Sequence, residues 1–250
     1  TEHSTSNRRR SNKILGMIDK FIFNGYDEIV SISHATENSL YDWVGGEKEK
    51  YAVIPNGIDL SIFENSVAVP RDELGMEKED VILMMVSRFH QSKNQKGAAE
   101  ALEYLSERYK MIFVGDGILE EDVKSYVNGK KLESRVKFLG KRKDIPKLLK
   151  TADIIIQFSF FEGFGMTAVE GMASGKPVIA SDVPGLADVV EGGGIICPND
   201  SKELAEVILS LEDKKLYDHT VEMCLRKSKK YSIENSAEEY IKLYREILER

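Results

Sequence analysis

The sequence contains few cysteines and prolines and no long apolar run. Cys197 and Cys224 are its only cysteines, so no disulfide framework is expected, and no Cys-x-x-Cys spacing indicates a zinc or redox site. This cysteine usage fits the reducing cytoplasm. No apolar run reaches the roughly 18 residues of a membrane span, and the start, TEHS, has neither a methionine nor an apolar signal region. We therefore expect a cytoplasmic protein whose chain begins mid-protein or after a removed segment.

The chain also lacks an excess of basic residues. It carries 35 Lys and Arg against 42 Asp and Glu, a net charge of -7, whereas nucleic-acid binders usually show a basic balance or a basic stripe. Hydrophobic residues make up 42% of the chain and only six residues are proline. This composition fits a folded protein with a substantial core. We expect no nucleic-acid partner.

Apolar runs alternate with amphipathic segments along most of the chain. The apolar runs are rich in Val, Ile and Phe without polar alternation, as in strands buried on both faces of a parallel sheet. Strands are predicted at residues 28–33, 51–54, 81–87, 110–115, 136–140, 153–159, 177–181 and 194–197. Helices are predicted at residues 13–24, 35–43, 94–108, 119–128, 143–150 and 166–174, and from about residue 201 onward. The alternation predicts an α/β fold with a doubly wound, Rossmann-like parallel sheet.

Two breaks divide the chain. A Pro-Asn-Gly turn signal lies at residues 55–57, and residues 64–78 are polar and irregular. The residues that follow form a self-contained run of strands and helices. We therefore expect three parts, namely the end of an N-terminal domain at 1–58, a ligand-binding Rossmann-like domain at 59–232, and a terminal helix at 233–250 that crosses back to the first part.

The strongest candidate site is the segment FEGFGMTAVE at residues 161–170. It follows a predicted strand and opens a helix, so Glu162 would lie at the carboxyl end of its strand, where open α/β sheets bind ligands. Glu170 would lie about one turn into the helix, at a distance suited to hydroxyl groups. Two carboxylates spaced this way can bind two sugars joined by a diphosphate. The plainer alternative is a strand–loop–helix turn with surface glutamates.

The backbone of the same segment favours a phosphate. Gly163 and Gly165 allow a ligand to approach the main chain closely. The free amides of Gly165, Met166 and Thr167 would point at that ligand from a helix N-terminus, which attracts anions.

Two further strand ends carry residues of the kind that bind ligands. Arg88 and Lys93 follow the predicted strand 81–87, and two cations there could neutralise a diphosphate leaving group. A solvated Arg and Lys in a loop is the plainer alternative. The Gly-Asp-Gly turn at 115–117 follows the next strand and is a weak signal alone, since it is a common turn. Together the three strand ends predict one ligand site.

From about residue 28 to its end, the chain resembles the C-terminal half of family 4 glycosyltransferases, which have the GT-B architecture. The matching features are the E-x7-E pair Glu162 and Glu170, the Arg88 and Lys93 loop, the Gly-Asp-Gly turn, FLG at 138–140, IPNGID at 54–59 and ASGKPVIA at 173–180. The sequence departs from the family at Asp188, where Glu is usual, and at Asn94, where Gly usually follows the Lys. Neither change removes a charge, and both leave the sugar preference open.

The resemblance implies a retaining glycosyltransferase that moves a sugar from a nucleoside-diphosphate sugar to an acceptor hydroxyl in glycan or polysaccharide biosynthesis. We expect a UDP-sugar as the donor, and a glycan, a lipid-linked molecule or a small molecule as the acceptor. In this family Arg and Lys at the positions of Arg88 and Lys93 bind the donor diphosphate. The resemblance also assigns Glu162 to the donor sugar and Glu170 to the ribose.

His3 resembles a family histidine of the N-terminal domain that faces the transferred sugar. With it, the residues expected to take part in catalysis are Arg88, Lys93, Glu162 and His3. The residues expected to bind the donor nucleotide are Gly115, Asp116, Gly117, Gly163, Phe164, Gly165, Met166, Thr167 and Glu170.

No Asp-x-Asp sequence occurs anywhere in the chain. Metal-dependent sugar transfer often uses such a pair to hold a divalent ion on the diphosphate. Here Arg88, Lys93 and the helix N-terminus can neutralise that charge instead. In line with the family, we expect no metal ion and no cofactor besides the donor itself.

Three basic residues, Arg8, Arg9 and Arg10, precede an amphipathic segment that contains Leu15, Ile18, Phe21 and Ile22. Such a segment suits contact with an anionic membrane or a charged acceptor. A location at the inner face of the membrane is then also consistent with the sequence. The alternative is a solvated charge run ahead of a packed helix.

Two other functions remain open on the sequence. The chain could be a donor-binding module without turnover, because the acceptor-binding domain is largely missing. It could also be another GT-B enzyme, such as a sugar-nucleotide epimerase, although the E-x7-E pair with the Arg/Lys loop argues against that reading.

Overall fold

Strands of two parallel sheets form the framework of the computed structural model, which describes residues 1–3 and 13–249. The smaller sheet pairs β1 (Ile29–Ser31) with β2 (Tyr51–Val53). The larger sheet has the order β5-β4-β3-β6-β7-β8. Its strands are β3 (Val81–Val86), β4 (Tyr109–Val114), β5 (Val136–Phe138), β6 (Ile154–Gln157), β7 (Val178–Ser181) and β8 (Ile195–Cys197). Every neighbouring pair is parallel, so the predicted α/β class with a parallel sheet is confirmed, and each predicted strand is present.

The order of the larger sheet fixes where a ligand can bind. Counted along the chain, its strands follow the order 3-2-1-4-5-6 of doubly wound nucleotide-binding sheets. The direction of the chain across the sheet reverses between β3 and β6, which pair side by side. In such sheets the ligand crevice lies outside the carboxyl ends of these two strands.

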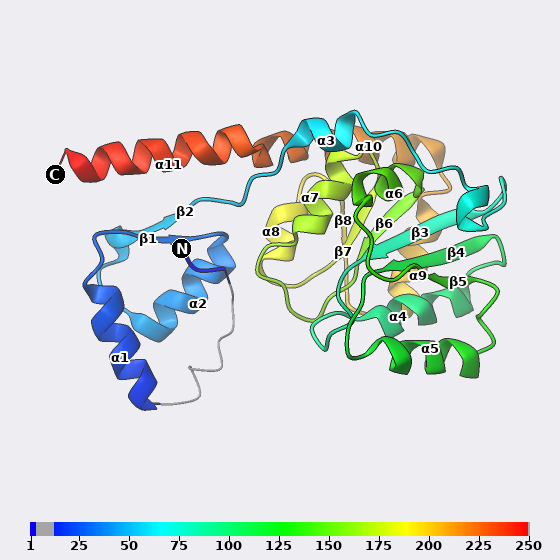
Figure 1. Ribbon diagram of the computed structural model, residues 1–250, viewed down its shortest axis with the longest axis horizontal. Coiled ribbons are helices and arrows are strands. Elements are labelled where there is room, and N and C mark those ends of the chain that lie inside the picture. Colours follow the sequence, from blue (N-terminus) through cyan, green and yellow to red (C-terminus); the bar gives the residue numbers. More distant parts are fainter. Residues whose placement is uncertain (4–12, 250) are drawn as a thin grey trace.

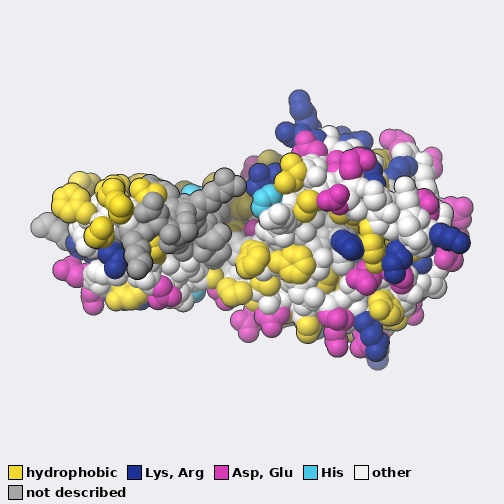
Figure 2. Space-filling model, turned by 90° about the horizontal axis from the view of Figure 1, so that it is seen from below, with side chains coloured by type: hydrophobic (Ala, Val, Ile, Leu, Met, Phe, Trp, Pro, Cys, Tyr) yellow, Lys and Arg dark blue, Asp and Glu magenta, His cyan; other side chains and the backbone are white. Residues whose placement is uncertain are grey.

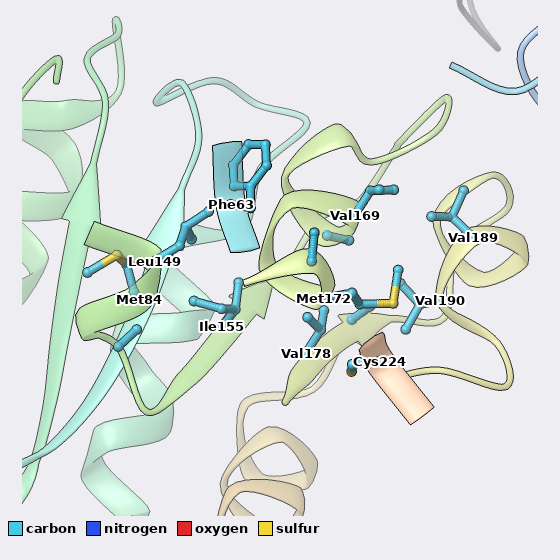
Figure 3. Close-up of a cluster of buried hydrophobic side chains, with 14 of the residues drawn as sticks. Phe63, Met84, Leu149, Ile155, Val169, Met172, Val178, Val189, Val190 and Cys224 are labelled. Atoms are coloured by element: carbon cyan, nitrogen blue, oxygen red, sulfur yellow. The ribbon is translucent and has the colours of Figure 1, made fainter. Parts of the chain in front are cut away.

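The large sheet is covered on both faces. Ile82 and Met84 of β3 belong to one hydrophobic cluster, while Leu83 and Met85 belong to the other. All four are essentially inaccessible to solvent, which explains the unbroken apolar run in the sequence. Figure 3 shows part of the first cluster, where Met172 of the helix after β6 lies beside the sheet.

The helices divide between these two faces and the smaller body. The first face is covered by α3 (Leu60–Glu64), α6 (Ile145–Thr151), α7 (Met166–Ala173), α8 (Leu186–Val190) and α10 (Lys214–Ser228). The second face is covered by α4 (Gln95–Glu100), α5 (Glu120–Gly129) and α9 (Ser201–Ser210). The remaining helices are α1 (Lys13–Asn24), α2 (His34–Val44) and α11 (Ile233–Leu248).

The helix predicted at residues 94–108 is wrong beyond Glu100. A short 3-10 turn covers Ala101–Tyr104, and Leu105 is extended. Arg135 stabilises this end, since its buried guanidinium donates hydrogen bonds to the carbonyl oxygens of residues 102, 105, 106 and 109. In a helix that ended at residue 108, only the Leu102 oxygen of these four would have a partner within the helix, so Arg135 chiefly satisfies carbonyl groups at the end of the helical segment.

Two short helices, α3 and α8, were not predicted. Each has five residues, which is too few for a helical period to be visible in the sequence. The Asp59 side chain caps α3 by accepting a hydrogen bond from the Ser61 amide at 3.0 Å.

A smaller body built from α1, α2 and the β1–β2 sheet lies at one end of the molecule, and α11 extends from the larger body back over it (Figure 1). Leu243 of α11 packs against Val30 and Ile54. The two connections between the bodies lie side by side, since the Ile58 amide donates to the Tyr231 carbonyl and the Ile233 amide donates to the Ile58 carbonyl, each at 2.9 Å. In the described part of the chain, no helix is long and apolar enough to cross a membrane.

Candidate functional site

The loop after β3 is held by two amide side chains, of which Gln95 is buried. Gln95 donates hydrogen bonds to the Ser87 hydroxyl at 3.0 Å and to the Arg88 carbonyl at 2.8 Å. The Asn94 side chain caps α4 by accepting from the Gly97 amide at 2.9 Å. These bonds fix the backbone at both ends of the loop, from which Arg88 and Lys93 project at the carboxyl edge of the sheet.

The Gly-Asp-Gly turn packs against that loop. Gly115 and Gly117 have φ of +136° and +154°, and a Cβ atom on either would collide with the carbonyl oxygens of Ser87 and Phe89. The Asp116 carbonyl accepts a hydrogen bond from the Phe89 amide at 2.9 Å. The two glycines are therefore needed for this close approach of backbones.

The loop after β6 brings Glu162 to Lys93. The two side chains form an ion pair and are only 19% and 16% exposed. Gln157, the last residue of β6, donates its side-chain amide to the same Glu162 oxygen, Oε2, at 3.3 Å. Gly165 follows with φ of +94° and begins α7. In the described residues, the amides of Met166 and Thr167 at this helix start have no acceptor.

These elements surround a cavity of about 510 Å³, a size typical of small-molecule sites. Of the residues predicted for the site, those that line it are His3, Arg88, Lys93, Glu162, Gly163, Phe164, Gly165, Met166 and Thr167. The structure thus brings the cations of the β3 loop, the carboxylate after β6 and the α7 N-terminus together, at the reversal point of the sheet.

Four predicted residues do not line this cavity. They are Gly115, Asp116, Gly117 and Glu170. The first three lie in the turn that packs behind the Arg88 loop. Glu170 is half-buried on α7, and its burial raises the pKa of its carboxyl. Phe164 lines the cavity, but its ring is buried and packs edge-on against Tyr231 at 5.4 Å.

The smaller body contributes a wall that the sequence did not reveal. Ile32 and Asn56 line the cavity beside His3. Ser33, the N-cap of α2, donates its hydroxyl to the Gly163 carbonyl at 2.7 Å, and Thr36 does so at 3.3 Å. A serine just before a helix is a recognisable cap signal, but its contact with a residue 130 positions away is visible only in the fold.

Like Val86 and Ser87, Gln157 is another cavity residue that was not predicted. Its signal was present, because it is a single polar residue after three isoleucines at the end of a buried strand. The carboxyl end of a strand is the place where such sheets present side chains to a ligand, so a buried amide there is a candidate ligand contact.

Arg8, Arg9 and Arg10 lie outside the described residues. In α1, Ile14, Met17 and Phe21 are exposed, and Figure 2 shows hydrophobic side chains gathered on the smaller body. Contact with a membrane stays a prediction. Among residues 1–3 and 13–249, no three His, Cys, Asp or Glu side chains form a cluster that could hold a metal ion, and independence of metal likewise stays a prediction.

Comparison with known proteins places these features in a family. Residues 69–231 match the family model described as Glycosyl transferases group 1. The chain is 31% identical over 190 residues to UDP-Gal:alpha-D-GlcNAc-diphosphoundecaprenol alpha-1,3-galactosyltransferase of Escherichia coli, covering 71% of this chain and 49% of that protein. It is 28% identical over 214 residues to N-acetyl-alpha-D-glucosaminyl L-malate synthase of Bacillus anthracis, covering 83% and 56%. The chain therefore spans about half the length of these curated relatives.

Solved structures agree in fold. Anabaena HepE in complex with UDP and glucose superposes with a TM-score of 0.88 and 25% identity, covering 98% of this chain and 70% of that one. WaaG, a glycosyltransferase involved in lipopolysaccharide biosynthesis, superposes with a TM-score of 0.70 and 21% identity, covering 81% and 58%. The GT-B type of fold is confirmed by these neighbours.

Proposed function

The chain belongs to the group 1 glycosyl transferases, and from this premise we propose that it transfers a sugar from a nucleoside-diphosphate sugar to an acceptor hydroxyl. The observation that carries the proposal is the convergence of Arg88, Lys93 and the α7 N-terminus on one cavity. Two side-chain cations and unpaired amides at the switch point of the sheet form a site for a diphosphate.

The cations act on the leaving group. As the bond between the anomeric carbon and the diphosphate oxygen breaks, negative charge grows on the diphosphate. Arg88, Lys93 and the amides of α7 stabilise that charge, because the loops after β3 and β6 already bring them to the cavity. No divalent ion is needed for this role, and we expect activity in the presence of a chelator.

We propose that the reaction retains the anomeric configuration. The acceptor oxygen forms its new bond to the anomeric carbon on the face from which the diphosphate departs, and the proton of the acceptor hydroxyl ends on the leaving diphosphate. In this mechanism Glu162 is not a nucleophile and instead positions the donor sugar, while Lys93 and Gln157 engage its Oε2. Glu170 binds the ribose, and His3 faces the transferred sugar.

The names of the relatives support a UDP-sugar donor and a glycan or lipid-linked acceptor. The Escherichia coli relative is named for UDP-Gal and a diphosphoundecaprenol acceptor, and HepE was solved with UDP and glucose. We accordingly propose that this protein works in polysaccharide or glycan synthesis in the cytoplasm. An epimerase is not favoured, because the relatives are named for transfer or synthesis.

The test is turnover by the full chain. The protein is incubated with UDP-glucose, UDP-galactose, UDP-N-acetylglucosamine or GDP-mannose and a panel of glycan and polyprenyl-diphosphate acceptors, with EDTA present. We expect nucleoside diphosphate release that depends on an acceptor, and a product whose anomeric configuration, read by NMR, equals that of the donor. Inversion would contradict retention, and a new free sugar nucleotide without acceptor would identify an epimerase. Tight nucleotide binding with no release under any acceptor would instead indicate a binding module.

A further inference from the structure

Gln157 has a position that the proposed roles do not explain. It ends β6 after three isoleucines and is 2% exposed, yet it lines the cavity. Its side-chain Nε2 donates a hydrogen bond to Glu162 Oε2 at 3.3 Å. Its other polar atom, Oε1, is buried and has no hydrogen-bond partner among residues 1–3 and 13–249. An unpartnered buried acceptor costs free energy that an apolar residue of similar size would avoid, so the stability of the strand does not account for a glutamine.

The neighbouring carboxylate fixes the orientation of the Gln157 amide. An amide carries donors on one side and an acceptor on the other. If the group were turned over, Oε1 would face the Glu162 carboxylate and two acceptors would repel. The donor side of Gln157 is therefore directed at Glu162.

Two donors converge on a single oxygen of Glu162. Lys93 and Gln157 both engage Oε2. In the described part of the chain no hydrogen bond to Glu162 Oε1 is found, which leaves this oxygen to accept from a ligand. Lys93, however, is also one of the two side-chain cations available for a diphosphate in the same cavity. When Lys93 moves to that diphosphate, Gln157 is the donor that remains on Glu162.

We propose that Gln157 is a positioning residue that holds the Glu162 carboxylate toward the donor sugar while Lys93 binds the diphosphate. This inference rests on the proposed function, because it takes Glu162 as the contact to the sugar. The two residues then have different roles: Lys93 binds the diphosphate, and Gln157 orients Glu162, which contacts the sugar.

The test compares binding of the nucleotide with and without its sugar. Gln157→Leu removes the donor and keeps the apolar character of the strand, and Gln157→Met serves if the leucine variant does not fold. Thr220→Val is the control, since Thr220 is equally buried and loses one hydrogen bond, to the Leu216 carbonyl, far from the cavity. Calorimetry measures Kd for UDP, UDP-glucose, UDP-galactose and UDP-N-acetylglucosamine with the full chain.

We expect Kd for UDP to stay within about twofold in the Gln157 variants. The ratio of Kd for the best UDP-sugar to Kd for UDP should rise about tenfold, the effect of a weakened hydrogen bond to a charged group. The control should leave this ratio unchanged. Equal losses for UDP and UDP-sugar, or no loss, would overturn the inference. Wild-type protein that binds no nucleotide would overturn the proposed function as well, whereas wild-type binding with an unchanged ratio in the variants would overturn this inference alone.

A second variant tests the proposal through the pH dependence of the Kd ratio, which a purely structural role of Gln157 would not change. In Gln157→Glu, two carboxylates face each other beside Lys93, with Arg88 and His3 lining the same cavity. At pH 8 they repel, and as the pH falls toward 5.5 they come to share a proton, so that a carboxyl O–H again donates to Glu162. The ratio of Kd values should therefore recover toward that of the wild type, measured at each pH in parallel. A ratio that does not recover with falling pH would count against the inference.

Discussion

Lys93 has two anionic partners to choose between. One is the Glu162 carboxylate with which it forms an ion pair, and the other is the diphosphate that we propose. Charge on the diphosphate grows as the glycosidic bond breaks, so a cation there binds the transition state better than the ground state. Lys93→Ala should lower kcat by about 10²–10³ with a smaller change in KM. Steady-state kinetics with the donor varied at saturating acceptor measures both.

Lys96 offers a matched control for this lysine. It lies on α4 three residues further along, over the Tyr126 ring, and does not line the cavity. Lys96→Ala should leave kcat and KM close to wild type. If Lys93→Ala instead raises KM at constant kcat, and added salt reproduces the change in wild type, Lys93 merely attracts the donor.

Glu170 shows how function and stability can oppose each other at one residue. Burial raises the pKa of its carboxyl, so the folded protein holds this proton more tightly than the unfolded chain. Its ionisation therefore lowers stability as the pH rises from the ordinary glutamate range through the raised value. Glu170→Gln should unfold at a higher temperature than wild type at pH 7.5, and the gain should vanish near pH 4. Thermal unfolding across this range measures it, and a gain that grows toward acid would contradict the assignment.

The same residue should matter for the nucleotide. Glu170→Ala should weaken UDP or GDP binding more than Glu162→Ala does, because Glu170 is assigned to the ribose and Glu162 to the donor sugar. A charged hydrogen bond is worth about 1.5–3 kcal/mol. Calorimetry with the bare diphosphates decides, and equal losses in both variants would refute the division of roles. Glu162 lines the cavity and Glu170 does not, so the assignment of Glu170 to the ribose depends more on this measurement than the assignment of Glu162 to the sugar.

At the scale of elements, the Gly-Asp-Gly turn supports the loop that carries Arg88. A methyl group at Gly117 would meet the backbone of Phe89, at a φ that other residues rarely adopt. Gly117→Ala should therefore lower Tm and weaken UDP binding by displacing the Arg88 loop. Gly129→Ala is the control, because a Cβ there meets nothing within 4 Å. Unchanged UDP affinity in a folded Gly117→Ala protein would show that the turn does not position the loop.

Elements were predictable where one local pattern decides the structure. The strands of the large sheet could be read from the sequence because burial on both faces leaves an unbroken apolar run, as in the VILMMV of β3. The helix after Asn94 was predicted too long, and its observed end is stabilised by Arg135, which lies 35 residues past Glu100 in the turn before β5. No local signal near Glu100 contains that contact.

The candidate site divides in the same way. Arg88, Lys93 and Glu162 could be predicted because strand ends of a parallel sheet meet at one edge. Ser33 was missed because its partner, Gly163, is brought near only by the fold. Gln157 was missed although a lone polar residue ends the apolar strand, because its bond to Glu162 depends on the path of the loop between them.

At the scale of the whole molecule, α11 ties the two bodies together. Leu243 is 9% exposed and packs against Val30 and Ile54 of the smaller body. Leu243→Ala should cost about 2 kcal/mol, the low end for a buried leucine, and should speed hydrogen exchange in β1 and β2 first. UDP affinity should change little. Leu248→Ala on the same helix, where the side chain is 86% exposed, is the control, and equal exchange in both variants would contradict this role of α11.

The central claim is that Arg88, Lys93 and the start of α7 hold a nucleoside diphosphate without a metal ion. The most direct measurement is calorimetric titration of UDP and GDP into the full chain in EDTA, for wild type, Arg88→Ala, Lys93→Ala and the double variant. We predict binding of at least one diphosphate that EDTA does not alter. We predict a loss of about tenfold or more in each single variant, and a double loss smaller than the two combined, because both cations serve one ligand. Binding that disappears with EDTA, or that is the same in all four proteins, would contradict the account.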